Sequence, residues 1–245
     1  MADFKYEQYT NSLKFMKRAV VLLSGGLDST TAAAVAKKDG YKIFALTIDY
    51  GQRHRIEINA AKQIAKALNA EQHIIFPINL RIFGGSSLTG DLEVAKDIPV
   101  EQIGNVIPTS YVPARNIIFL STALAYAETV NAEKIYIGVS AIDYSGYPDC
   151  RPEFINAFEN MANIATKFGT EGKKISIAAP LAKLDKTETI KLGLSLGVDY
   201  SLTHTCYDPT INGAACGRCE SCLLRLQAFA NAGINDPVKY DKKIR

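Results

Sequence analysis

Residues 19–30 read Ala-Val-Val-Leu-Leu-Ser-Gly-Gly-Leu-Asp-Ser-Thr, an apolar run followed at once by a glycine-rich turn. The apolar run is typical of a buried strand, and the alanine-rich segment after the turn predicts a helix. Two adjacent glycines, Gly25 and Gly26, let the backbone approach a ligand closely. The free N–H groups at the start of the helix then face that ligand with a favourable dipole. The stretch therefore predicts a phosphate-binding turn between a strand and a helix.

This turn differs from two familiar phosphate-binding loops. It lacks the Gly-Lys-Ser/Thr ending of a Walker A loop, and it contains no G-x-G-x-x-G dinucleotide fingerprint. It resembles the S-G-G-x-D-S loop of the ATP pyrophosphatases, the PP-loop enzymes, which cleave ATP to AMP and pyrophosphate. An ordinary strand–helix turn with Asp28 or Ser29 as a cap is the alternative that the turn alone leaves open.

Short apolar segments alternate with helical segments along most of the chain, which predicts an α/β fold with a parallel sheet and helices on both faces. The PP-loop resemblance implies the adenine-nucleotide hydrolase-like version of this fold. Ligands in such folds bind beyond the carboxyl ends of the strands, so the loops after the first, second and fourth strands are expected to meet at one site. The expected strands are 18–23, 42–48, 72–76, 134–139 and 175–178, and the expected helices are 28–38, 53–69, 114–130, 151–168, 186–196 and 219–230.

The bulk properties predict a chain with one substantial core. Its 245 residues are 47% hydrophobic, and the formal net charge of +3 does not suggest a large nucleic-acid footprint. No apolar stretch is long enough to span a bilayer, and no secretory signal is visible, so we expect a cytoplasmic protein. The predicted parts are an N-terminal extension over 1–17, a nucleotide-binding domain over 18–200 and a metal-binding segment over 201–245. The long irregular stretch 77–113 predicts a lid or binding loop.

Four of the five cysteines lie close together near the C-terminus, and their Cys-x-x-Cys spacing suits a tetrahedral metal ion. The spacing leaves the metal open between structural zinc and an iron–sulfur cluster, because C-x-x-C-x-x-C also occurs in ferredoxins. Cys150 stands apart and is either a small buried residue or part of a substrate pocket. The four expected ligands are Cys206, Cys216, Cys219 and Cys222.

Further segments sharpen the resemblance. Together with the PP-loop and the cysteines they resemble the 7-cyano-7-deazaguanine synthase family, which makes preQ0 on the route to queuosine. The resemblance runs from about residue 18 to residue 230, and its most specific part is the run Asp-Tyr-Ser-Gly-Tyr-Pro-Asp-Cys-Arg. The segments are 49–54, 111–116, 143–151, 179–181, 186–188 and 205–207.

The resemblance implies an enzyme, an ATP-dependent C–N ligase. It would convert 7-carboxy-7-deazaguanine and ammonia to the nitrile through an adenylated acid and an adenylated amide, with release of AMP and pyrophosphate. ATP would act with Mg²⁺, and the four cysteines would hold one structural zinc per chain. The implied partners are these small molecules, without nucleic acid or membrane, and a homodimer is one expected assembly.

The resemblance also implies roles for particular residues. The expected catalytic residues are Asp28, Ser29, Arg115 and Lys186. The expected ATP-binding residues are Leu22, Leu23, Ser24, Gly25, Gly26, Leu27, Asp28, Ser29, Thr30, Thr31, Ala32 and Arg53. The expected substrate-binding residues are Asp143, Tyr144, Tyr147 and Asp149. His54 is a candidate for either a catalytic or a capping role.

Two other functions are compatible with parts of the pattern. A PP-loop tRNA thiolase or amidotransferase would call for a tRNA-binding appendage, strong basic charge or a catalytic cysteine pair near the loop, and the sequence shows none of these. A zinc-stabilised RNA-binding module without catalysis would not need an intact nucleotide loop. Pyrophosphate release that depends on the deazaguanine carboxylate and not on RNA distinguishes both from the synthase.

Overall fold

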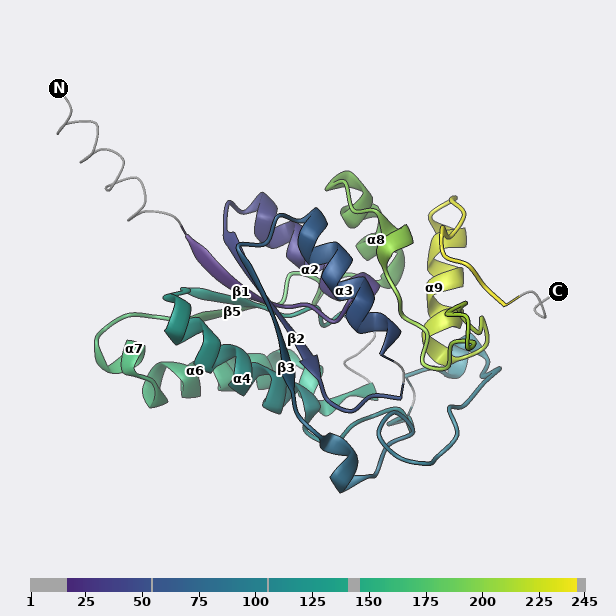
Figure 1. Cartoon of the computed structure of the whole chain (residues 1–245), viewed down its shortest axis with the longest axis horizontal. Helices are drawn as coiled ribbons and strands as arrows, with labels where there is room; N and C mark the ends of the chain where they lie inside the picture. Colours follow the sequence, from purple (N-terminus) through teal and green to yellow (C-terminus); the bar gives the residue numbers. More distant parts are fainter. Residues whose placement is uncertain (1–16, 54, 105, 141–145, 242–245) are drawn as a thin grey trace.

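The computed structural model describes residues 17–53, 55–104, 106–140 and 146–241, in which one sheet lies between layers of helices (Figure 1). All neighbouring strands are parallel, in the order β3-β2-β1-β4-β5, which confirms the predicted parallel α/β fold. The strands are β1 (Arg18–Leu22), β2 (Lys42–Asp49), β3 (Gln72–Pro77), β4 (Lys134–Tyr136) and β5 (Ser176–Ala178). The helices are α2 (Leu27–Lys38), α3 (Ile56–Ala67), α4 (Arg115–Val130), α6 (Pro152–Ala165), α7 (Lys167–Thr170), α8 (Lys186–Ser195) and α9 (Glu220–Asn231). Short 3₁₀ helices are η1 (Leu80–Phe83), η2 (Val100–Gln102), η3 (Pro148–Cys150) and η4 (Tyr200–Leu202).

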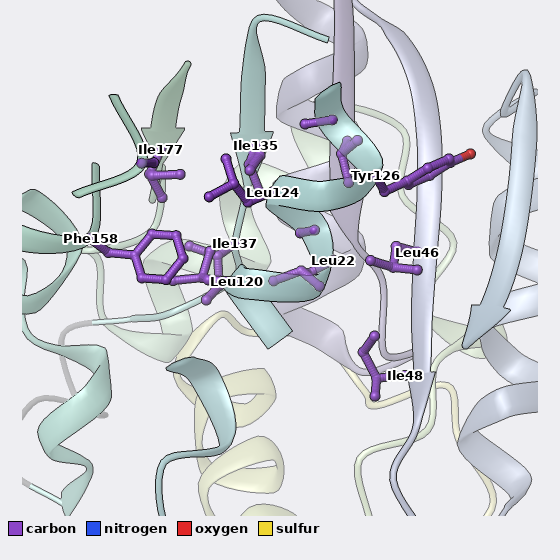
Figure 2. Packing of buried hydrophobic residues seen from close by; sticks show 14 of the residues in the cluster. Leu22, Leu46, Ile48, Leu120, Leu124, Tyr126, Ile135, Ile137, Phe158 and Ile177 are labelled. Atoms are coloured by element: carbon purple, nitrogen blue, oxygen red, sulfur yellow. The ribbon is translucent and has the colours of Figure 1, made fainter. Parts of the chain in front are cut away.

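Both faces of the central strand β1 are buried. Val21 packs with α2 and α3 on one face, and Val20 and Leu22 pack with α4 on the other. Figure 2 shows Leu22 beside Leu120 of α4, with Phe158 of α6 extending the same layer. This two-sided burial explains why the strand reads as a continuous apolar run rather than an alternating one.

One predicted helix, 151–168, is divided in the structure. Helix α6 ends at Ala165, and Thr166 takes extended backbone angles with φ −111° and ψ 158°. The Thr166 hydroxyl then accepts a hydrogen bond from the backbone N–H of Gly169 at 3.2 Å. Threonine is a favoured N-cap residue, so the chain begins a new helix, α7, at this point.

The strand predicted over 134–139 ends three residues earlier, at Tyr136. Beyond it, Gly138 passes so close to α2 that a Cβ atom there would lie 2.7 Å from the backbone nitrogen of Ser29. Only glycine permits this approach. The chain after β4 therefore lies against the glycine-rich loop, as the sheet topology predicts.

Hydrogen bonds connect the chain around residues 200–204 to α2 and to the glycine-rich loop. The Tyr200 hydroxyl lies 2.8 Å from the Thr31 hydroxyl, and the backbone N–H of His204 donates to the Gly25 carbonyl at 2.9 Å. Arg225 forms a buried ion pair with Asp236 at 2.7 Å. These contacts bring the cysteine-rich segment next to the nucleotide loop. In the described part of the chain, every helix is too short or too polar to cross a bilayer.

Candidate functional site

The glycine-rich loop joins β1 to α2 and lies directly under α3. Gly25 has φ +88°, in the left-handed region that favours glycine. A Cβ atom on Gly25 would lie 2.3 Å from the carbonyl oxygen of Glu57 and 2.7 Å from the backbone nitrogen of Ala61. The loop can therefore take this path only because residue 25 has no side chain.

Hydroxyl groups hold the shape of the loop. The Ser24 and Ser29 hydroxyls lie 3.0 Å apart, and the Ser29 hydroxyl donates to the Gly26 carbonyl at 3.1 Å. The Thr30 hydroxyl donates to the same carbonyl at 2.7 Å. Among the described residues no side chain caps α2 at Gly26. The start of α2 thus offers its N–H groups and helix dipole to an anion.

A cavity of about 240 Å³ opens above this loop, at the carboxyl ends of β1, β2 and β4. Arg53 contributes to its wall, and Tyr147 and Cys150 line it from the segment after β4. The residues predicted to be catalytic or to bind ATP or substrate that line it are Leu22, Leu23, Ser24, Gly26, Leu27, Asp28, Ser29, Arg53, Arg115 and Tyr147. The predicted metal ligand Cys206 lines it as well. The loop after β1 and the segments that follow β2 and β4 thus meet at one site.

Lys186 reaches the loop from α8. Its ammonium group lies 2.5 Å from an Asp28 carboxylate oxygen and donates to the Ser140 hydroxyl at 3.2 Å. A capping box formed by Asp185 and Glu188 fixes the first turn of α8, and so fixes Lys186 at its start. Two of the predicted catalytic residues are therefore brought together, although they are 158 positions apart in the sequence.

Arg115 brings a positive charge to the cavity from the start of α4, in addition to that of Arg53. Its guanidinium carbon lies 6.0 Å from the centre of the Tyr50 ring and 5.9 Å from that of Phe119, a cation–π arrangement. Within the described residues Arg115 forms no ion pair. The residue before it, Ala114, has φ +56°, so the backbone enters α4 through a left-handed turn that aims Arg115 at the cavity wall.

Asp149, predicted to bind substrate, is buried and does not line this cavity. One of its carboxylate oxygens accepts a hydrogen bond from the backbone N–H of Asn116 at 2.8 Å. The Asn116 amide in turn donates to the Asp149 carbonyl at 3.1 Å and contacts the Cys150 sulfur at 3.2 Å. In this structure Asp149 therefore holds the first turn of α4, and contact with a substrate stays a prediction.

The remaining predicted residues occupy several environments. Tyr147 lines the cavity, and its hydroxyl lies 3.0 Å from that of Ser110. Thr31 points away from the cavity toward Tyr200, and direct contact of Thr30, Thr31 and Ala32 with ATP stays a prediction. Residues named in the sequence analysis that lie outside the described part of the chain are His54, Asp143 and Tyr144.

Glu57 lines the cavity, although the sequence patterns do not single it out. Burial raises the pKa of its carboxyl group to about 7, and the charge of Asp49 adds to the rise. Arg115 and a hydrogen bond from Gln52 lower that pKa, without offsetting the rise. Its position could have been suspected, because it is an acidic residue in the first turn of the helix after the second strand. Other unpredicted lining residues include Tyr50, Gln52, Phe119, Thr205 and Tyr207.

The four clustered cysteines form a buried group that could hold a metal ion. Their sulfur atoms all lie within 4.8 Å of one another, and those of Cys216 and Cys222 are 4.0 Å apart. A tetrahedral site with metal–sulfur bonds of about 2.3 Å needs similar spacings. Backbone N–H groups point at the sulfurs, with Cys216 donating to Cys206 at 3.1 Å. Hydrogen bonds among the thiols lower the pKa of Cys216 and Cys219 and raise the pKa of Cys206 and Cys222, so two of the four thiols favour the thiolate form.

The long segment 84–113 is tied to this cysteine cluster. Lys96 pairs with Cys219 in an antiparallel bridge, and its ammonium group lies 2.5 Å from an Asp208 carboxylate oxygen. The backbone N–H of Asp97 donates to the Arg218 carbonyl at 2.8 Å. The same segment carries Leu88 into the cavity wall. The cysteine cluster is therefore linked to a segment that contributes to the cavity wall.

The chain is similar to proteins of one family over nearly its whole length. The family model of the queuosine biosynthesis protein QueC matches residues 18–233. A 7-cyano-7-deazaguanine synthase from Citrifermentans bemidjiense is 59% identical over 226 residues, which is 92% of this chain and 99% of that protein. A synthase of the same name from Myxococcus xanthus is 55% identical over 225 residues, which is 92% of this chain and 98% of that protein. Among solved structures, an NMN synthetase from Francisella tularensis gives a TM-score of 0.47 at 22% identity, covering 80% of this chain and 68% of that one.

Proposed function

The chain belongs to the family of the queuosine biosynthesis protein QueC, and from this premise we propose that it converts 7-carboxy-7-deazaguanine and ammonia to 7-cyano-7-deazaguanine at the expense of ATP. The family is the one predicted from the sequence motifs, and its curated members carry the name of this synthase. The observation that carries the proposal is that the glycine-rich loop and Arg115 line one cavity at the sheet edge, while Lys186 pairs with Asp28 of that loop.

The first half of the reaction activates a poor electrophile. The substrate carboxylate attacks the α-phosphorus of ATP, an acyl–AMP bond forms, and pyrophosphate leaves toward the N-terminus of α2. The N–H groups there and the charges of Lys186 and Arg115 stabilise the negative charge that develops on the phosphate oxygens. Mg²⁺ would neutralise further phosphate charge, and Asp28 is the carboxylate at the loop that could hold it.

The second half makes the nitrile. Ammonia attacks the acyl carbon, the bond to AMP breaks, and an amide forms. The amide oxygen then attacks the α-phosphorus of a second ATP, and pyrophosphate leaves. Breaking the bond from the carbon to the AMP oxygen, with loss of both protons from the nitrogen, leaves the carbon–nitrogen triple bond. Each round transfers an adenylyl group from one ATP and releases one pyrophosphate. One pyrophosphate-binding loop can therefore serve both rounds.

Release of pyrophosphate tests this proposal directly. We expect pyrophosphate release to require the deazaguanine carboxylate and to be unchanged by added RNA. Release that requires tRNA would instead favour a PP-loop thiolase or amidotransferase. The comparison also separates catalysis from simple RNA binding, which would give no release with either substrate.

Asp28→Ala is expected to lower carboxylate-dependent pyrophosphate release by roughly 100-fold, the usual cost of losing one transition-state charge contact. The substitution removes a possible metal ligand and takes away the carboxylate partner of Lys186. Asp91→Ala is the matched control, because Asp91 is an exposed aspartate that does not line the cavity. Initial rates of pyrophosphate release measure both variants. Near-normal turnover of Asp28→Ala would show that Asp28 is not needed for catalysis.

The metal at the cysteine cluster is proposed to be zinc with a structural role. All four thiols are buried and close the tetrahedron among themselves, so no position is left for a substrate. Zinc rather than an iron–sulfur cluster is proposed on the basis of family membership. The cluster then stabilises the C-terminal segment and the loop that it anchors.

The remaining properties follow as proposals of the same kind. A cytoplasmic location fits a metabolic synthase with free buried thiols. A homodimer is supported by large apolar side chains that are exposed on and near η1, including Ile82 and Phe83, which is 77% exposed. The substrates are small molecules, and no nucleic-acid partner is proposed.

A further inference from the structure

Glu57 is an acidic side chain of the cavity wall that the two adenylation steps do not use. It is the second residue of α3, and its backbone carbonyl lies against Gly25 of the glycine-rich loop. Arg115, Gln52 and Tyr50 also line the cavity. Arg115 interacts electrostatically with both Glu57 and Tyr50, and Gln52 forms a hydrogen bond with the Glu57 carboxyl group. Glu57 thus lies against the glycine-rich loop through its backbone and shares the cavity wall with Arg115.

The surroundings of Glu57 keep it ready to exchange a proton near neutral pH. Burial raises the pKa of its carboxyl group to about 7, and the nearby charge of Asp49 acts in the same direction. Arg115 and Gln52 oppose the rise and so prevent the group from being permanently protonated. Asp49 itself is paired with Arg55. A carboxyl group with this pKa in a cavity is typical of a general acid or base.

We propose that Glu57 is the general base that removes a proton from ammonium at the adenylated acid. This inference rests on the proposed function, because that reaction supplies both the ammonium and the acyl adenylate. Ammonium has no lone pair with which to attack. The carboxylate of Glu57 accepts one proton, and the lone pair so released forms the C–N bond. The bond between the acyl carbon and the AMP oxygen breaks, AMP leaves with that electron pair, and a second proton passes to solvent.

Glu57→Gln keeps the shape of the side chain and removes its basicity. The expected result is a fall of roughly 100-fold in kcat/KM for ammonium at neutral pH, the lower end of the usual contribution of a general base. Carboxylate-dependent exchange of pyrophosphate into ATP is expected to stay within a few-fold of wild type, because that step needs no base. Hydroxylamine, which is unprotonated at neutral pH, is expected to restore acyl transfer, measured as the hydroxamate.

The pH profile provides a readout that a purely structural role would not move. In the wild type, kcat/KM for total ammonium should rise with pH and bend near 7, as Glu57 becomes deprotonated. In Glu57→Gln it should rise in proportion to free ammonia, without that bend. In Asp49→Asn the bend should move to lower pH, because removing a negative neighbour lowers the pKa of Glu57. This second variant leaves Glu57 in place, so it tests the proposal even if Glu57→Gln folds poorly.

Each outcome gives a decision. Loss of the ammonium step with intact pyrophosphate exchange and rescue by hydroxylamine supports the proposal, as does a shifted bend in Asp49→Asn. Normal use of ammonium by Glu57→Gln overturns it, and so does loss of pyrophosphate exchange, which would place Glu57 at the nucleotide. A bend that moves to higher pH in Asp49→Asn also contradicts it. A wild-type protein that performs no carboxylate-dependent exchange overturns the proposed function itself, and the role of Glu57 with it.

Discussion

Gly25→Ala is expected to abolish carboxylate-dependent pyrophosphate release and to destabilise the fold by at least about 3 kcal/mol. The added methyl group would lie 2.3 Å from the Glu57 carbonyl oxygen and 2.7 Å from the Ala61 nitrogen, both of which are backbone atoms. Backbone inside a helix cannot move aside cheaply, so either α3 or the loop must shift. A shifted loop no longer presents the N-terminus of α2 to the leaving pyrophosphate.

Gly40→Ala is the matched control for this substitution. Gly40 has φ +82°, nearly the same as Gly25, but no atom lies within 4 Å of the position that its Cβ would take. Both variants therefore carry the backbone strain of alanine in the left-handed region, about 1–2 kcal/mol. Only Gly25→Ala adds the collision. Thermal melting and pyrophosphate release measure the difference, and equal effects in the two variants would contradict the close approach of α3 to the loop.

Cys206→Ser is expected to cause a large loss of stability, because it removes one ligand of the proposed four-thiolate metal site. The wild-type protein should be colourless and carry about one zinc per chain. Structural zinc sites contribute on the order of 10 kcal/mol in isolated zinc-finger peptides, so even a fraction of that free energy is a large share of the stability of a domain. We expect loss of bound metal, a clearly lower melting temperature, and a raised KM because the loop at Lys96 loses its anchor.

Cys150→Ser provides the comparison for the metal measurement. Cys150 is also a buried cysteine, but it lies outside the cluster. Its serine variant should keep a full complement of zinc. Metal analysis and thermal melting compare the metal content and stability of the two variants. A brown protein that contains iron and acid-labile sulfide would replace zinc by an iron–sulfur cluster and would revive the thiolase alternative.

The parts of the fold that could be predicted are those that depend on local sequence. The apolar run before Gly25 and the alanines after it define a strand, a turn and a helix without reference to distant residues. The spacing of the cysteines predicts their cluster in the same way, since short loops bring them together. The break at Thr166 could not be predicted, because a threonine in a helical pattern becomes a cap only when the chain leaves the helix there.

The site was predictable only in part, because its geometry is set by contacts between distant segments. The pairing of Lys186 with Asp28 depends on how α8 packs against α2, which the sequence does not specify. The side chain of Asp149 turns toward the backbone of Asn116 rather than into the cavity, and a motif cannot show such an orientation. The perturbed carboxyl group of Glu57 is likewise a product of burial, which appears only once α3 covers the loop.

This chain is expected to turn a carboxylate into a nitrile with nitrogen from ammonia. The most direct measurement is mass spectrometry of the products after incubation with 7-carboxy-7-deazaguanine, ATP, Mg²⁺ and ¹⁵N-labelled ammonium. The expected product is the nitrile carrying one ¹⁵N atom, with two AMP and two pyrophosphate formed for each nitrile. Recovery of unchanged carboxylate under conditions in which the protein binds ATP would contradict the claim, as would a product that contains no ¹⁵N.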